Sequence, residues 1–188
     1  MFIVIEGADG TGKSTLCPLL SDIIGAVSCK TPPDHYEKSR KLIDKSASPA
    51  EKYAYYKTGV IETSKYIRKL LAEGKHVVVD RYWLTTFIYH EIIGVPVRRS
   101  DFKDIIEPDL TILLSMHIDI QLQRMHQRGL SIRDRNMIDK QETISLAYYR
   151  NILKYNLPFI ALNTGIIGQD DCASICAEII NSIISRSR

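Results

Sequence analysis

A glycine-rich segment near the start of the chain constrains the fold more than any other feature. It reads Gly7-Ala8-Asp9-Gly10-Thr11-Gly12-Lys13-Ser14 and matches G-x-x-x-x-G-K-[ST] in full. A wholly apolar run, Phe2 to Ile5, precedes it, and a helical pattern from Lys13 to Ile24 follows it. Because the motif requires this strand-loop-helix context, the segment predicts a phosphate-binding loop at the end of a buried strand, and the alternative is a chance glycine-rich turn.

The residue types in this loop suit a nucleoside triphosphate. The glycines let the backbone curl so that its N–H groups converge on phosphate oxygens, and the following helix points its positive end at the same anion. Lys13 is expected to reach the terminal phosphates, and the Ser14 hydroxyl is expected to ligate Mg²⁺. We therefore predict that residues Gly7 to Thr15 bind ATP.

The rest of the chain alternates short apolar runs with longer helical patterns. This alternation predicts a parallel sheet with crossover helices, and 188 residues suit one domain. The expected strands are Phe2–Ile5, Gly25–Cys29, His76–Val79, Leu110–Leu114 and Phe159–Leu162. The expected helices are Lys13–Ile24, Tyr36–Lys45, Ala50–Ala72, Leu84–Ile93, Asp119–Arg128, Asp139–Leu153 and Cys172–Ile184. The polar, charged stretch Gly129 to Lys140 is predicted to be a mobile loop or lid.

Composition excludes several classes of protein. With 25 Lys plus Arg against 22 Asp plus Glu, the net charge of +3 argues against wholesale nucleic-acid binding. No apolar run approaches the length of a membrane span, and no signal peptide or anchor is expected. The four cysteines form no CxxC pair, so we predict free thiols in a reducing, cytoplasmic compartment.

Two charged residues stand at the end of the third expected strand. Asp80 is placed where a carboxylate can hold a water of the magnesium shell, and Arg81 follows as a cation beside the phosphates. The alternatives are a strand-end cap for Asp80 and a solvated surface charge for Arg81. Next to a phosphate-binding loop, we interpret the pair as functional.

Four stretches together resemble the thymidylate kinases: FIVIEGADGTGKST at the start, VVVDRYWLTTFIY at the third strand, PDLTILL at the fourth, and the spacing of Arg124 and Arg128. The resemblance runs from Phe2 to about Tyr149. It implies a P-loop kinase fold, a three-layer α/β/α sandwich with a five-stranded parallel sheet and a short lid. It also implies transfer of the γ-phosphate of ATP to dTMP, a need for Mg²⁺, and a homodimer.

The resemblance assigns roles to individual residues. Lys13 and Ser14 would hold the ATP phosphates and magnesium, Asp9 would lie near the acceptor sugar and the reacting phosphates, and Arg81 would contact the acceptor phosphate. The remaining assignments are Arg124 and Arg128 to ATP, Thr85 and Thr86 to the pyrimidine, Tyr89 to the deoxyribose, and Tyr149 to the acceptor. Packing within a core helix is the alternative for Thr85, Thr86 and Tyr89.

The chain departs from the family pattern where the acceptor binds. The family stacks the base on a Phe and binds it with an Arg four residues later, whereas the nearest match here is Tyr53 with Lys57. Lysine lacks the planar, two-pronged contact of a guanidinium, which leaves the acceptor base open. Lys30 is the nearest substitute for an acceptor-phosphate arginine after the second strand.

The lid is expected to supply catalytic charge. Some family members carry an arginine within the phosphate-binding loop, but this chain has Gly10 there. We therefore predict that Arg133 and Arg135, with Arg128, close over the donor phosphates and expel water. The alternative is a solvated basic loop.

Other functions remain open on the sequence alone. A deoxynucleoside kinase would need Asp9 or Glu6 as a general base to deprotonate the acceptor hydroxyl, and a kinase for another nucleoside monophosphate would not. A nucleotide-binding switch is a more remote alternative, because the guanine-reading [NT]KxD segment is absent. The apolar faces of Ala50–Ala72 and Leu84–Ile93 could pack against a second copy or within one chain.

Overall fold

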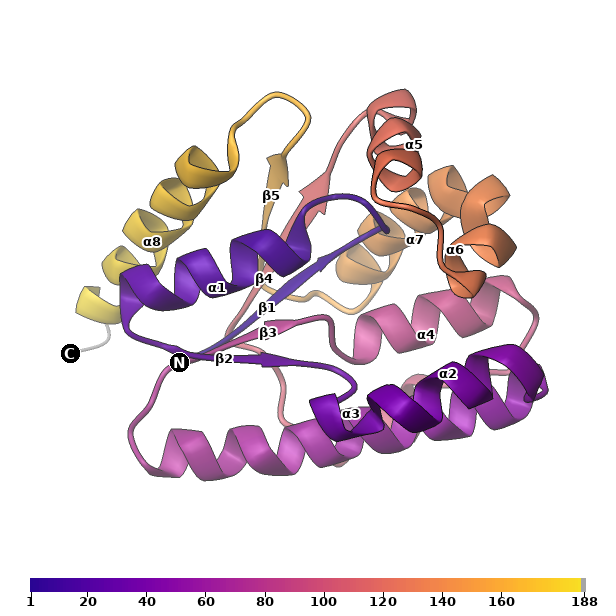
Figure 1. The fold of residues 1–188 in the computed structure, drawn as a ribbon. Helices are drawn as coiled ribbons and strands as arrows, with labels where there is room; N and C mark the ends of the chain where they lie inside the picture. Colours follow the sequence, from indigo (N-terminus) through magenta and orange to yellow (C-terminus); the bar gives the residue numbers. More distant parts are fainter. Residues whose placement is uncertain (187–188) are drawn as a thin grey trace.

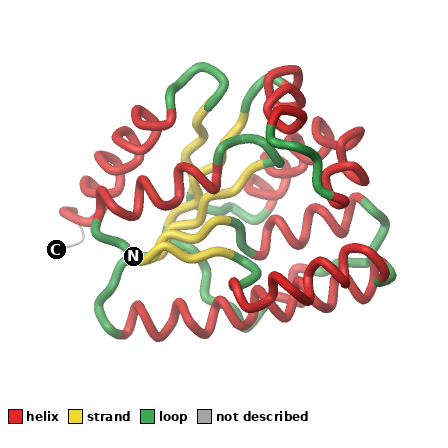
Figure 2. Tube along the Cα trace, in the orientation of Figure 1, coloured by secondary structure: helices red, strands yellow, loops and turns green. Residues whose placement is uncertain are grey.

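The computed structural model describes residues 1–186, and five parallel strands form its central sheet. The strands are β1 (Phe2–Gly7), β2 (Val27–Lys30), β3 (Val77–Asp80), β4 (Leu110–Ser115) and β5 (Phe159–Asn163), in the order β2-β3-β1-β4-β5 (Figure 1). All four strand pairings are parallel, as expected. The carboxyl ends of the strands meet at one edge, where the loops gather (Figure 2).

Strand β1 shows why these apolar runs form a sheet with two covered faces. Phe2 and Val4 point into one hydrophobic core, and the alternating Ile3 and Ile5 point into the other. All four side chains are fully buried or nearly so. A strand covered on both faces has no polar alternation, which is why the sequence reads as continuous hydrophobicity.

Helices cover the two faces. Helices α1 (Lys13–Ile24) and α8 (Gln169–Arg186) pack together on one face, while α3 (Pro49–Ala72), α4 (Trp83–Ile92) and α7 (Gln141–Lys154) cover the other (Figure 1). Helices α2 (Glu37–Ser46), α5 (Ile118–Gln127) and α6 (Ile132–Met137) lie toward the carboxyl edge of the sheet. Three short 3-10 helices complete the described part: η1 (Asp34–Tyr36), η2 (Arg99–Phe102) and η3 (Ile138–Lys140).

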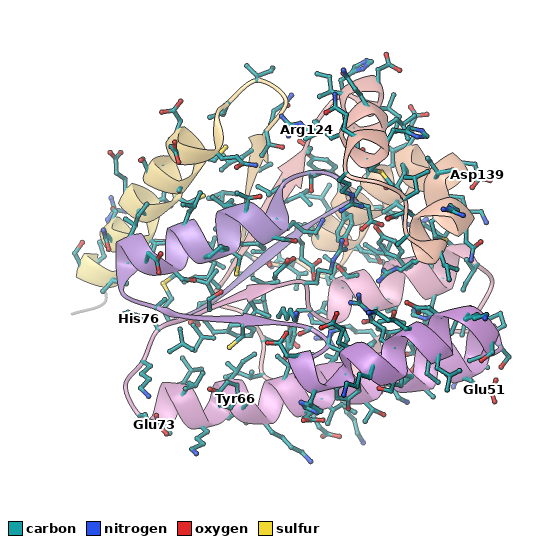
Figure 3. The ribbon with its side chains drawn as sticks, in the orientation of Figure 1. Glu51, Tyr66, Glu73, His76, Arg124 and Asp139 are labelled. Atoms are coloured by element: carbon teal, nitrogen blue, oxygen red, sulfur yellow. The ribbon has the colours of Figure 1, made fainter. Side chains whose placement is uncertain are left out.

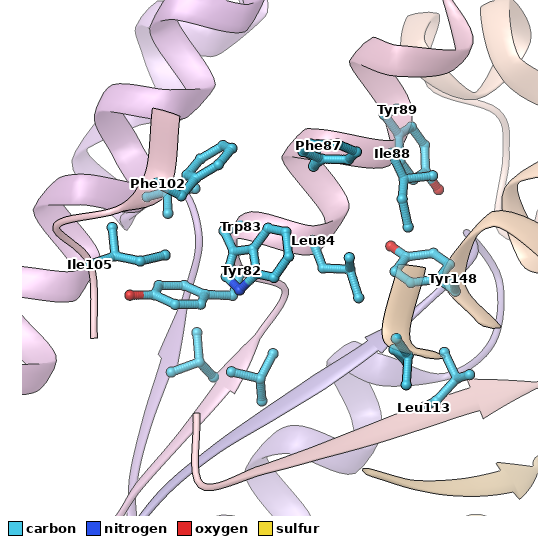
Figure 4. Packing of buried hydrophobic residues seen from close by; sticks show 14 of the residues in the cluster. Tyr82, Trp83, Leu84, Phe87, Ile88, Tyr89, Phe102, Ile105, Leu113 and Tyr148 are labelled. Carbon is cyan, nitrogen blue, oxygen red and sulfur yellow. The ribbon is translucent and has the colours of Figure 1, made fainter. Parts of the chain in front are cut away.

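The apolar faces of α3 and α4 are buried within this chain. Trp83 packs edge-on against Phe87 and lies 5.8 Å from the ring of Phe102, in the core beneath α4 (Figure 4). Every residue from Trp83 to His90 is buried. These faces therefore belong to the core of one chain, and the homodimer remains a prediction.

The stretch Gly129–Lys140, which we call the lid segment, is not the loop predicted from its composition. It contains α6 and η3. Helix α6 begins at a capping box, in which the Ser131 hydroxyl accepts from the Asp134 backbone N–H while the Asp134 carboxylate accepts from the Ser131 N–H. This reciprocal pairing satisfies two of the helix's first amide groups, which offsets its short length.

Three further observations concern the described residues. No helix in residues 1–186 is long and apolar enough to cross a bilayer. All four cysteines are free thiols, and Cys17, Cys172 and Cys176 are buried. Over the same residues, no three His, Cys, Asp or Glu side chains gather as a metal cage.

Candidate active site

The glycine-rich loop joins β1 to α1 and requires glycine for steric reasons. Gly7 has φ +145°, and a Cβ added there would lie 2.4 Å from the Leu114 carbonyl oxygen of the neighbouring strand. At the other end, Gly12 (φ +93°) caps α1 without any side-chain hydrogen bond, and the first turn of the helix holds no acidic residue. The first amide groups of α1 are therefore available to an anion.

Lys13 folds back onto the loop that it follows. Its Nζ donates to the Ala8 carbonyl at 2.6 Å, and the side chain is almost fully buried. Burial, together with the nearby Arg81 cation, lowers the pKa of Lys13 to about 7 despite the neighbouring carboxylates. An anionic ligand here would restore its positive charge.

Asp9, Arg81 and Tyr89 form the centre of the site. Arg81 Nη2 donates to Asp9 Oδ1 at 2.5 Å, and the Tyr89 hydroxyl donates to Asp9 Oδ2 at 2.7 Å. Burial alone would raise the pKa of Asp9, but the Arg81, Arg133 and Lys13 cations outweigh it and hold that pKa well below its usual range. The Asp9 carboxylate is thus a very weak base.

The backbone at Arg81 is strained. Its φ is +68°, a left-handed conformation that few residues other than glycine adopt. Its backbone N–H donates to the Ile5 carbonyl, while the buried Nη1 of its side chain has no partner among the described residues. A strained turn thus holds a guanidinium with one nitrogen free to bind an anion.

Glu6 fixes the turn that carries Arg81. Its Oε1 accepts from the backbone N–H groups of Tyr82 and Thr85, and its Oε2 accepts from the Thr85 hydroxyl. Glu6 is buried, and this burial raises its pKa. Because both oxygens are engaged, Glu6 acts as the cap of α4 and is poorly placed to bind a substrate.

The residues expected at the magnesium site line one cavity. A space of about 510 Å³ is bordered by Ser14, Lys30, Asp80 and Arg81. The Asp80 Oδ1 atom is buried and has no hydrogen-bond partner within residues 1–186, and the Ser14 side chain is exposed to this space. Oxygen ligands of this kind suit Mg²⁺, which keeps several waters and needs few protein ligands, so these two residues fit the ion.

The two arginines assigned to ATP lie beside the glycine-rich loop. A cavity of about 320 Å³ is lined by Thr15, Arg124, Arg128, Gln169 and neighbouring residues of the loop. Arg124 lies near the loop after β5 (Figure 3), where its Nη2 donates to the Thr164 carbonyl at 3.1 Å. This side of the site suits the triphosphate donor.

The structure separates the two lid arginines. The Arg133 guanidinium lies 4.4 Å from the centre of the Tyr89 ring and 5.4 Å from that of Tyr56, and it acts on the Asp9 carboxylate. Arg135, one residue after the capping Asp134, is exposed and lines none of the cavities around Asp9. Arg133 is therefore the lid cation at the site.

Two of the residues expected to recognise the base point elsewhere. The Tyr53 hydroxyl donates to Asp101 at 2.7 Å, and Lys57 lies over the Tyr53 ring, with its Nζ 5.6 Å from the ring centre. Neither lines the cavity of about 410 Å³ that contains Asp9 and Arg133. Tyr56, one turn further along α3, lines that cavity instead.

Three further expected acceptor residues also have partners within the fold. The Thr85 hydroxyl is hydrogen-bonded to Glu6 and Tyr148. Thr86 is buried, and its backbone carbonyl is hydrogen-bonded to the ring of His90. The Tyr149 hydroxyl lies 3.3 Å from Ser115 Oγ, away from Asp9. The aromatic residue of α7 that approaches the site is therefore Tyr148 (Figure 4).

Gly10 has a packing reason to lack a side chain. With φ +85°, a Cβ at this position would lie 2.9 Å from Met125 Cγ and 3.1 Å from the Gln121 carbonyl oxygen. An arginine at this position could not keep the same loop conformation. The loop as folded is thus incompatible with an arginine here, and Arg133 and Arg128 both line the Asp9 cavity in its place.

Three site residues have no counterpart among the sequence predictions. Tyr56, Arg40 and Gln169 line the cavities around Asp9 and Ser14. Tyr56 was detectable only as one of several tyrosines in a helix, and Arg40 as one charge among many in α2. Whether such residues line a cavity depends on which way their helix faces, and the residue types alone do not give this.

Comparisons with known proteins place the chain in a family. The family model for thymidylate kinase matches residues 5–163. A thymidylate kinase from Brachyspira hyodysenteriae is 30% identical over 196 residues, which cover 96% of this chain and 92% of that protein. Among solved structures, a thymidylate kinase from Candida albicans superimposes with a TM-score of 0.79 at 20% identity, over 96% of this chain and 91% of that one. A deoxyadenosine kinase from M. mycoides superimposes with a TM-score of 0.72, also at 20% identity, over 98% and 99%. The match over residues 5–163 shows that this chain belongs to the thymidylate kinase family.

Proposed function

We propose that this protein transfers the γ-phosphate of ATP to dTMP and forms dTDP. The relatives named thymidylate kinase support the choice of acceptor. The site supports the reaction class independently, because a phosphate-binding loop with Lys13 stands opposite a buried arginine with a free nitrogen.

One observation favours a monophosphate acceptor over a nucleoside. Neither carboxylate at the end of β1 is available as a base: both oxygens of Glu6 are bonded within the fold, and Asp9 is paired with Arg81 and has a strongly lowered pKa. A nucleoside hydroxyl needs such a base, whereas the oxygen of a monophosphate is already largely ionised at neutral pH. The acceptor must therefore bring its own nucleophile.

The residues divide the work of alignment and charge compensation. The loop amides, Lys13 and the start of α1 hold the donor phosphates, and Arg81 binds the acceptor phosphate with its unpartnered Nη1. Arg133 adds positive charge from the lid segment. Ser14 and, through water, Asp80 would hold Mg²⁺, which neutralises charge on the phosphates when it is bound.

The acceptor side is bounded by residues of three helices. Tyr56 of α3 and Tyr89 of α4 flank the Arg133 guanidinium, and Arg40 of α2 lines the cavities on both sides of Arg81. We assign Tyr56 to the nucleoside and Arg40, with Lys30, to the acceptor phosphate. Replacing Tyr56 by Leu should raise the KM for dTMP about tenfold through lost stacking, whereas Tyr53→Phe should leave it unchanged.

A panel of acceptors tests the proposed function. ADP formation is measured in a coupled assay with dTMP, dUMP, dCMP, dGMP and thymidine at equal concentrations. We expect dTMP to give the highest kcat/KM and thymidine to give no activity above the ATPase background. Faster turnover of thymidine would establish a nucleoside kinase, and ADP formation independent of any acceptor would indicate a nucleotide hydrolase.

A further inference from the structure

Two glutamines are buried between the lid segment and the phosphate-binding loop. Gln121 on α5 is 1% exposed, and Gln141 at the start of α7 is 0% exposed. Gln121 Nε2 donates to Gln141 Oε1 at 2.8 Å, so the two amides form a direct pair. Neither residue lines a cavity of the proposed site.

Each glutamine also bonds a backbone carbonyl at one end of the pair. Gln121 Nε2 donates to the Asp9 carbonyl at 2.7 Å, within the loop. Gln141 Nε2 donates to the carbonyl of Met137, the last residue of α6, at 3.1 Å. A continuous chain of three hydrogen bonds thus joins the end of the lid helix to the loop.

The loop rests on α5 at the same place. The Gly10 Cα lies so close to α5 that a Cβ would meet Met125 and the Gln121 carbonyl. The Gln121 bond to the Asp9 carbonyl fixes the Asp9–Gly10 peptide, whose N–H group belongs to the loop. A carbonyl that accepts a hydrogen bond polarises its peptide and strengthens the donor on the other side.

Residues of the lid segment therefore act on Asp9 in two ways. Its carboxylate feels the charge of Arg133, and its carbonyl is held through Gln121 and Gln141. The first effect acts through space, and the second acts through hydrogen bonds of two buried amides, in which Gln121 Oε1 is the one amide atom without a partner among the described residues. Burying an amide costs free energy unless its polar atoms are bonded, and Gln121 keeps an unpartnered buried oxygen, so the pair is costlier to bury than apolar side chains would be.

We propose that Gln121 and Gln141 are positioning residues for phosphoryl transfer, which hold the Asp9–Gly10 peptide in its reactive orientation when the lid helix is docked. The proposal rests on the proposed function. It predicts that loss of either amide lowers kcat without a matching change in substrate binding, because the transferred group is misplaced while the charges that bind it remain.

The test uses Gln121→Met, Gln141→Met and the double variant in the full chain, assayed with ATP and dTMP. Methionine keeps the length of the side chain and removes the amide. We expect each single variant to lose about fivefold to tenfold in kcat, with both KM values within about twofold of the wild type. If the pair acts as one unit, the double variant should lose no more than either single variant. Gln123→Met, at an exposed position of the same helix, is the matched control.

A second variant gives a readout that a packing role would not produce. In Gln141→Glu, the introduced carboxyl can accept from Gln121 and, while protonated, donate to the Met137 carbonyl. Burial raises the pKa of such a carboxyl, so kcat relative to the wild type should be high at pH 6 and fall toward pH 8. This profile also decides the matter if the methionine variants fail to fold.

The outcomes are distinguishable. Wild-type kcat in the methionine variants, additive losses in the double variant, or a flat relative pH profile for Gln141→Glu would each overturn the proposal. Absence of dTMP phosphorylation by the wild type would instead overturn the proposed function.

Discussion

Arg81 Nη2 donates a hydrogen bond to Asp9 Oδ1 at 2.5 Å, while Arg81 Nη1 is buried and has no partner in the described part of the chain. The same side chain, which borders the cavity, therefore neutralises a carboxylate of the phosphate-binding loop and keeps a second donor nitrogen unpaired. Its backbone is held in a left-handed conformation, with Glu6 accepting from the N–H of the following residue. This position needs the planar guanidinium of arginine, because a lysine ammonium cannot hydrogen-bond the Asp9 carboxylate and the acceptor phosphate in the same geometry.

Replacing Arg81 with Lys should separate acceptor binding from donor binding. The lysine ammonium can pair with Asp9 but cannot also reach the acceptor phosphate in the same geometry. We expect kcat/KM for dTMP to fall about 100-fold, with less than about a threefold change in the KM for ATP. Steady-state kinetics with each substrate varied in turn would measure both. An equal loss for the two substrates would contradict the assignment of Arg81 to the acceptor.

ATP binding should be accompanied by proton uptake at Lys13. Its pKa is lowered to about 7 in the free protein, so at pH 8 the amine is mostly neutral, and the triphosphate favours the charged form. Calorimetry at pH 8 in buffers of different ionisation enthalpy should show uptake approaching about one proton. Lys13→Arg keeps a permanent charge and should show none from this group.

The same pKa shift predicts a stability effect in the free protein. Between pH 7 and the ordinary lysine value of 10.5, the unfolded chain binds a proton at Lys13 that the folded chain does not. The contribution of this group to stability therefore rises with pH across that window and is lost as the pH falls through it. Comparing urea midpoints of the wild type and Lys13→Met between pH 7 and pH 10 would isolate this contribution.

Substitution of the two lid arginines should have very different effects on kcat. Arg133 stacks on Tyr89 and faces Asp9, whereas Arg135 is exposed. Arg133→Gln should lower kcat by about 10³, the range attributed to arginines that stabilise charge in phosphoryl transfer, and Arg135→Gln should change it less than about twofold. Equal losses in both variants would mean that the lid helix rotates during turnover.

Gly7 should be intolerant of any side chain. A Cβ there meets the Leu114 carbonyl oxygen at 2.4 Å, and backbone in the neighbouring strand cannot give way. Gly7→Ala should lower the free energy of unfolding by about 3 kcal/mol or more. Gly74→Ala, also at positive φ but facing open space, should cost only about 1 kcal/mol, and chemical denaturation of both variants would test the difference.

The sheet and the phosphate-binding loop could be predicted because local sequence determines them. Short runs rich in apolar and β-branched residues indicated all five strands, with β2 shifted to Val27–Lys30, and α1 has the predicted bounds, Lys13–Ile24. The missed helix α6 left a signal in the sequence, since Ser131 and Asp134 have the spacing of a capping box. The charge of the surrounding segment concealed it.

Helix phase decides which of the two lid arginines lies at the site. Arg133 and Arg135 are two residues apart, so they lie roughly 200° apart around α6 and only one can face Asp9. Tyr53 and Tyr56 lie one turn apart on the same side of α3, and the rings of both lie near that of His90, but Tyr53 is bonded to Asp101 while Tyr56 lines the acceptor cavity. The Gln121–Gln141 pair depends on contacts between distant helices and has no local sequence pattern.

Transfer of the γ-phosphate from ATP to dTMP is tested most directly by following the transferred group itself. Enzyme, dTMP and ATP radiolabelled in its γ-phosphate are mixed for a single turnover, and the products are separated. We expect the label to appear in dTDP at the rate of ATP loss, and we expect Lys13→Met to abolish this transfer. Label released as inorganic phosphate, or found on a nucleoside supplied in place of dTMP, would contradict this expectation.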